Sequence, residues 1–149
     1  MLKNKIQEDL KAAMKAGDAA KLSAIRMLKS AIQYFEIQKG AGYEATDEDV
    51  IGVVGREIKK RRESIELYKQ GGRDESAASE QAEVEVLESY LPKQMSEDEV
   101  RSLVKQAVEQ TGAGSPTDMG KVMGVLMPKV KGKADGTLVS TIVREALSS

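Results

Sequence analysis

The chain has 149 residues, of which 40% are hydrophobic and 32% charged, a balance typical of one globular domain or two small ones. Its lack of cysteine and histidine excludes disulfides, thiolate metal sites, cysteine nucleophiles, hydroxyl–His–acid triads and zinc-water hydrolysis. A formal net charge of −1 argues against the nonspecific nucleic-acid affinity of an overall basic protein, although local basic patches stay open.

Charged residues interrupt the apolar positions of residues 1–17 every second or third residue, unlike the apolar core of a signal peptide. No stretch of the sequence approaches the ~18 consecutive apolar residues that a membrane span needs. We therefore expect a cytoplasmic protein without a membrane partner.

Two amphipathic helices are predicted first. Apolar residues four apart give the first helix one apolar face, which ends before Gly17: Leu2, Ile6, Leu10 and Met14. After a possible cap at Asp18, a second stripe continues to Gly40: Leu22, Ile25, Leu28, Ile32 and Phe35. The two helices are expected to form an antiparallel hairpin.

A long third helix is predicted from Thr46, which forms a capping-box pattern with Asp49, to the glycines at 71 and 72. Its apolar stripe is Val50, Val54, Ile58, Ile65 and Tyr68. Gly52 and Gly55 inside this helix each cost about 1 kcal/mol relative to alanine. We expect close packing of a neighbouring helix to be the reason for them.

The fourth helix starts near Asp74, carries Val84, Leu87 and Leu91, and ends at Pro92. Residues 74–99 contain nine acidic side chains against one lysine, a pattern typical of a solvated face, and we assign it no function.

Three further helices are predicted beyond Pro92. Ser96 with Glu99 opens the fifth, which ends at Gly112, and Ser115, Pro116 and Asp118 open a short sixth helix that Pro128 closes. The last helix follows Asp135, and its apolar stripe is Leu138, Ile142 and Ala146. Met119, Met123 and Met127 fall four apart in the sixth helix, which favours a core stripe over a binding groove.

Seven helices and no strand predict an all-α protein. We expect an N-terminal bundle of about four helices over residues 1–92 and a small three-helix C-terminal module over residues 93–149.

The basic run of the third helix is one candidate RNA contact: Lys59, Lys60, Arg61 and Arg62. Four consecutive residues do not share one helical face, and carboxylates lie four positions away at Glu57, Glu63 and Glu66. Ion pairing within the helix is therefore favoured over RNA contact, and the run is a secondary candidate.

The segment 118–136 is the more specific candidate. It carries Lys121, Lys129, Lys131 and Lys133 with no acidic residue between Asp118 and Asp135. Its glycines leave the backbone lightly covered, so amides and ammonium groups are able to approach a phosphate or ribose closely. The other interpretation, in which the glycines serve helix packing and the lysines solubility, explains the residues equally well.

Several motifs together resemble the GatB/YqeY family over nearly the whole chain: RMLKSAI from Arg26, EIKKRRES from Glu57, YLP from Tyr90, and DMGKVMG and LMPKVKGKADG between Asp118 and Gly136. This resemblance implies a larger N-terminal helical part and a three-helix tail module. The family contains free-standing helical proteins and the tail domain of the GatB component of the glutamine-dependent aspartyl/glutamyl-tRNA amidotransferase.

The resemblance also implies a function. In the amidotransferase the tail domain helps to hold tRNA, and a similar domain is appended to some glutaminyl-tRNA synthetases. The family label adds carbon–nitrogen ligase activity with glutamine as amido-N-donor, but the kinase-like and amidase parts of that machine have no counterpart in this chain. The sequence predicts no catalytic residues, no metal site and no cofactor.

The leading hypothesis is an accessory tRNA-binding protein in which Lys121, Lys129, Lys131 and Lys133 contact the RNA backbone. A tRNA-dependent amidation or aminoacylation enzyme is the expected protein partner. The alternative hypothesis is a protein–protein interaction adaptor that does not bind RNA.

Overall fold

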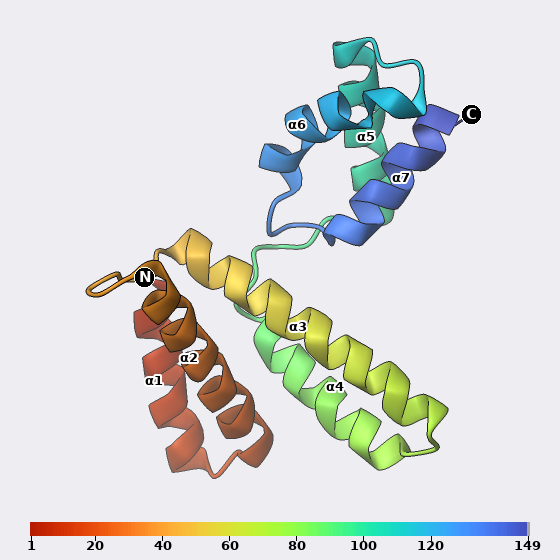
Figure 1. The fold of residues 1–149 in the computed structure, drawn as a ribbon. Helices are drawn as coiled ribbons and strands as arrows, with labels where there is room; N and C mark the ends of the chain where they lie inside the picture. The colour runs from red at the N-terminus through yellow and green to blue at the C-terminus, as the bar shows by residue number, and fades with distance from the viewer. Residues whose placement is uncertain (149) are drawn as a thin grey trace. The chain divides into compact units, whose positions relative to one another are not determined.

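The computed structural model describes residues 1–148, and within them the fold is all-α, which confirms the predicted class (Figure 1). The elements in chain order are α1 (Leu2–Ala16), α2 (Ala19–Lys39), α3 (Asp47–Gln70), α4 (Asp74–Glu88), α5 (Glu97–Thr111), the short 3₁₀ helix η1 (Pro116–Asp118), α6 (Met119–Val130) and α7 (Gly136–Ser148). None of these helices is both long enough and apolar enough to cross a bilayer.

The chain divides into two compact units, a first unit over Met1–Leu91 and a second that begins at Pro92. Each unit has a hydrophobic core of its own. Helices α1 to α4 build the first core, and α5 to α7 build the second.

Side-chain caps start the helices where the sequence predicts them. Asp18 accepts a hydrogen bond from the Lys21 backbone N–H at 3.1 Å, and Ser96 accepts one from Glu99 at 3.2 Å. Thr46 and Asp49 bond reciprocally as a capping box. These bonds satisfy amides that have no partner inside the helix, so local sequence alone fixes these helix starts.

In the first unit, the core consists mainly of the predicted stripes. Ile6, Ile25, Leu28, Val50 and Val54 are almost completely buried. Met14 is an exception, because its side chain is 56% exposed and Ala13 takes the buried position in the last turn of α1. The prediction of a four-residue stripe on α1 is therefore wrong at its last member.

The prediction of close packing at the two glycines of α3 is also wrong. A Cβ atom built on Gly55 meets nothing within 4 Å, and one on Gly52 meets only the flexible end of Arg56 at 3.8 Å. No neighbouring backbone approaches either glycine, so packing does not require them.

In the second unit, valine and leucine form the core rather than methionine. Val122, Leu126 and Val130 of α6 are buried, whereas Met127 is 37% exposed and Met119 and Met123 are partly buried at the edge of the core. On α7 the last core residue is Leu147, and Ala146 is exposed. The predicted methionine stripe thus lies at the edge of the core, and valine and leucine take the buried positions of α6.

Helix α6 does not end at Pro128 as predicted but continues to Val130. Proline removes the hydrogen bond to the carbonyl four residues earlier, here that of Gly124. Both residues are exposed, so water is able to solvate the released carbonyl. The helix therefore tolerates this proline on its solvent face.

Candidate nucleic-acid interface

A capping box positions the start of α6. The Asp118 carboxylate accepts hydrogen bonds from the backbone N–H groups of Gly114 and Ser115 at 3.0 and 3.3 Å. The bond from Gly114 is the main reason that the pKa of Asp118 lies below its usual range. With Pro116 in the first turn, this arrangement fixes the direction in which α6 begins.

The loop after α6 is held by hydrogen bonds to the segment before α5. Gly132 has a φ of +75°, which a side chain would disfavour, and its carbonyl accepts a hydrogen bond from Gln94 Nε2 at 2.9 Å. The Lys133 carbonyl accepts one from the Met95 backbone N–H at 2.8 Å. The backbone of the loop is therefore tied within the second unit while its lysines point away from the core.

The four predicted lysines are all exposed: Lys121, Lys129, Lys131 and Lys133. Lys121 lies 3.9 Å from Asp118, a long ion pair that leaves most of its ammonium group in water. Within residues 1–148, no ion pair joins Lys129 or Lys133 to a carboxylate. This surface, Lys121 together with residues 129–133, is called the lysine surface below.

Two glycines of α6 lie beside the lysine surface without a packing reason. Gly120 and Gly124 are exposed, and a Cβ atom on either would meet nothing within 4 Å. Each glycine costs about 1 kcal/mol relative to alanine in an exposed helix. The sequence allowed helix packing as an explanation of these two glycines. The structure shows no packing contact at either of them.

Three of the secondary candidates on α3 already form ion pairs with carboxylates of the protein. Lys60 lies 3.4 Å from Glu57, and Arg62 lies 2.7 Å from Glu88 of α4. Arg61 is buried, where its Nη1 bonds Glu80 and Glu83 of α4 at 3.1 and 2.6 Å. The carboxylates that pair with Arg61 and Arg62 are thus on α4 and not, as the spacing predicts, on α3.

Comparison with known proteins agrees with this architecture. The family model described as "Yqey-like protein" matches residues 3–147. The chain belongs to the YqeY family.

Two of three fungal relatives of this YqeY family member carry a mitochondrial name. Altered inheritance of mitochondria protein 41, mitochondrial, from Pyrenophora tritici-repentis is 32% identical over 97% of this chain and 80% of its own length. A protein of the same name from Saccharomyces cerevisiae is 34% identical over 58% of this chain and 46% of its own length. An uncharacterised Schizosaccharomyces pombe protein is 30% identical over 61% of this chain and 72% of its own length. The cytoplasmic location expected from the sequence stays a prediction.

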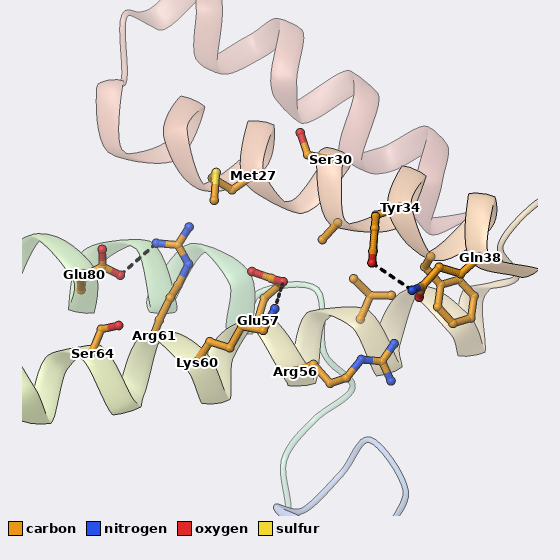
Figure 2. Close-up of a pocket in the computed structure, with 13 residues that line it drawn as sticks. Met27, Ser30, Tyr34, Gln38, Arg56, Glu57, Lys60, Arg61, Ser64 and Glu80 are labelled. Atoms are coloured by element: carbon orange, nitrogen blue, oxygen red, sulfur yellow. Dashed lines mark hydrogen bonds and ion pairs between the residues drawn. The ribbon is translucent and has the colours of Figure 1, made fainter.

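The first unit of this YqeY protein also contains a groove between α2 and α3, with a volume of about 720 Å³ (Figure 2). Apolar side chains supply its floor at Ala31, Phe35 and Val53. Met27 and Tyr34 border it on α2 and are 54% and 64% exposed. This hollow is called the α2–α3 groove below.

Cations line the α3 side of the groove, and two of the three have carboxylate partners. Figure 2 places Lys60 beside Glu57 and Arg61 beside Glu80. The Arg56 guanidinium instead stacks over the Phe35 ring, 5.7 Å from its centroid, and no ion pair joins it to a carboxylate of the described residues. The Nε atom of Arg61 is buried without an acceptor.

Sequence reasoning missed the groove, although α2 carries a signal for it. The stripe from Leu22 to Ile32 already accounts for the core-facing side of α2. Met27 and Tyr34 lie off that stripe and seven residues apart, which places them on one second face of the helix. An apolar face beyond the one that the core needs indicates contact with something else.

Proposed function

We propose that this YqeY family member is an accessory RNA-binding protein, with tRNA as the RNA, and that the lysine surface contacts the RNA backbone. The proposal assigns the protein no catalytic step. The family resemblance supports tRNA as the RNA, and a tRNA-dependent amidation or aminoacylation enzyme is the protein partner that this role implies.

One observation carries the proposal. Gly120 and Gly124 leave the α6 backbone uncovered on its exposed side, no packing partner accounts for them, and Lys121 directly follows the first of them. A helix backbone without Cβ atoms allows a phosphate or ribose to approach more closely than a covered one. The ammonium group of Lys121, the residue after Gly120, then supplies charge to the same ligand.

Recognition is expected to follow the shape of the RNA rather than its base sequence. No aromatic residue follows Tyr90, so the second unit has no ring on which an unpaired base would stack. Lysine binds phosphate as a mobile point charge and reads no base edge by itself. The affinity is therefore expected to depend on salt and to vary little among tRNAs.

The test is a fluorescence-anisotropy titration of labelled total tRNA with the full chain. The variant changes Lys121, Lys129, Lys131 and Lys133 to glutamine. The control changes the same number of exposed lysines elsewhere, so that both variants have the same net charge: Lys11, Lys15, Lys69 and Lys105. We expect the first variant to bind roughly a hundredfold more weakly than the native chain at low salt, and the control to lose far less.

Equal losses in the two variants would mean that net charge, not the lysine surface, governs binding. The alternative, a protein adaptor without an RNA role, predicts that the native chain does not bind tRNA at all. It also predicts that protein partners recovered with the chain survive nuclease treatment while tRNA is not enriched.

A further inference from the structure

The α2–α3 groove has the form of a docking site for a helix. Its α2 wall runs from Met27 to Gln38 and its α3 wall from Val53 to Ser64, so each wall spans about 16 Å, or three helical turns. Two helices that border an apolar floor present ridges between which a third helix fits. An added β-strand is excluded by the walls themselves, because helix backbones offer no unpaired edge.

The side chains that border the groove are those that dominate binding energy at protein interfaces. Met27 and Tyr34 are large, apolar and more than half exposed, and they point toward α3 in Figure 2. Tyrosine and arginine are enriched among interface hot spots, and methionine adapts its shape to different partners. Met27 and Tyr34 are not part of the core of the first unit.

Charge indicates the partner's chemistry. Of the three cations on the α3 wall, Lys60 and Arg61 already have carboxylates, so the groove does not present the net positive field that attracts RNA. Among these three cations, only Arg56 has no carboxylate partner in the described residues. One acidic side chain at the matching end of a docked helix would complement it.

We propose that the α2–α3 groove binds an amphipathic helix of a partner protein, whose apolar stripe covers Phe35 and Val53 between Met27 and Tyr34 and whose acidic residue pairs with Arg56. This site lies in the first unit and does not depend on the proposed RNA contact of the second unit.

A displayed library of helical peptides of about 14 residues tests the proposal, because that length covers the three-turn walls. Selection on the full native chain is expected to enrich peptides with apolar residues at i, i+3 or i+4, and i+7 and an acidic residue at one end. Synthetic copies of the enriched peptides are then titrated by fluorescence anisotropy.

Three variants locate the binding. Tyr34→Ser is expected to weaken the selected peptides roughly tenfold or more, whereas Leu67→Ser, at a comparably exposed site outside the groove, leaves binding unchanged. Arg56→Glu is expected to reverse the end-charge preference, so that a peptide with lysine in place of its acidic residue binds better than the original. Arg144→Glu in the second unit makes the same charge change and should not reverse it.

Circular dichroism of each variant verifies that the helices are intact. No enrichment, or enriched peptides that bind Tyr34→Ser and Leu67→Ser equally, overturns the proposal.

Two results would assign the groove to another occupant and so overturn the proposal. If Arg56→Glu weakens tRNA binding more than Arg144→Glu does, the groove belongs to RNA. A dimer in sedimentation equilibrium that Tyr34→Ser abolishes assigns it instead to a second copy of the chain. The lysine-surface variant should retain peptide binding, so the two proposals fail separately.

Discussion

Arg61 of α3 and Glu83 of α4 form a buried ion pair, with Nη1 2.6 Å from Oε2 and each residue only 8% exposed. Glu80 approaches the same Nη1 at 3.1 Å from one turn earlier on α4. A buried charge is tolerated only when it is paired, so this contact fixes which faces of α3 and α4 meet.

We expect Glu83→Gln to lower the free energy of unfolding of the first unit by about 3 kcal/mol, because removing one partner leaves the guanidinium buried with less compensation. The double variant Arg61→Met/Glu83→Leu should recover most of this loss, because it replaces the whole pair with apolar groups of similar size. Urea unfolding followed by circular dichroism measures both. A single variant as stable as the native chain would show that water screens the pair.

The same contact marks where sequence reasoning stops. The acidic residues of α4 are expected from the sequence to be solvated, and the basic run of α3 is expected to pair within its own helix. Helical spacing predicts neighbours three and four residues apart on one helix, but it contains no information on which face of a second helix comes within reach. Arg61 and Glu83 find each other through packing, which only the folded structure specifies.

Helix starts, in contrast, are predictable because they depend on a few adjacent residues. Thr46 with Asp49, and Ser115 with Asp118, form the bonds that their spacing predicts. The four lysines of the lysine surface are exposed, as expected for charged residues on a helix face and in a loop, but their joint contact with RNA stays a prediction. The α2–α3 groove is not predictable, because Met27 and Arg56 belong to helices whose approach angle no local pattern encodes.

A partly buried hydrogen bond predicts a dependence of stability on pH. Tyr90 Oη donates a hydrogen bond to Asp9 Oδ2 at 2.6 Å, and Lys5 lies 3.2 Å from the same carboxylate oxygen. Burial and this bond raise the pKa of Tyr90 above its usual range. Burial acts to raise the pKa of Asp9, but the bonds from Tyr90 and Lys5 outweigh it and hold that pKa below its usual range.

The sign of each effect follows from linkage. A raised tyrosine pKa stabilises the fold at pH values below about 10, and the contribution is lost as the pH rises toward the folded-state pKa. A lowered aspartate pKa stabilises the fold above about pH 4, and the contribution is lost as the pH falls through the folded-state pKa. Stability should therefore decline at both extremes.

We expect Tyr90→Phe to lower the free energy of unfolding at pH 7 by about 1.5 kcal/mol, because it removes a hydrogen bond to a charged group. Its stability should also decline less than that of the native chain between about pH 10 and 11, since this ionisation no longer contributes. Urea midpoints at pH 7, 10 and 11 measure both effects. Parallel alkaline declines in the two proteins would contradict the assignment to Tyr90.

The lysine surface predicts a salt dependence. If each of its four lysines neutralises one phosphate, the slope of log K against log salt concentration is about −3. Changing all of them to glutamine should remove nearly all of that slope, and Lys121→Gln alone should remove less than Lys129→Gln, because Asp118 already lies 3.9 Å from Lys121. Anisotropy titrations with tRNA between about 50 and 200 mM salt measure the slopes. An unchanged slope in the four-lysine variant would exclude phosphate contact at this surface.

The bare face of α6 gives a test in which stability and binding change in opposite directions. Gly120→Ala and Gly124→Ala place a Cβ atom in open space, so each should raise the free energy of unfolding of the second unit by about 0.5–1 kcal/mol. If RNA approaches the α6 backbone there, the same methyl groups hold the phosphate away and the affinity for tRNA falls.

Gly55→Ala on α3 is the matched control, because its added Cβ atom also meets nothing within 4 Å. It should stabilise the first unit without affecting tRNA binding. Thermal unfolding and anisotropy titration of the three variants separate the cases. Glycine variants of α6 that are more stable and bind tRNA as well as the native chain would mean that the lysines act without the bare backbone.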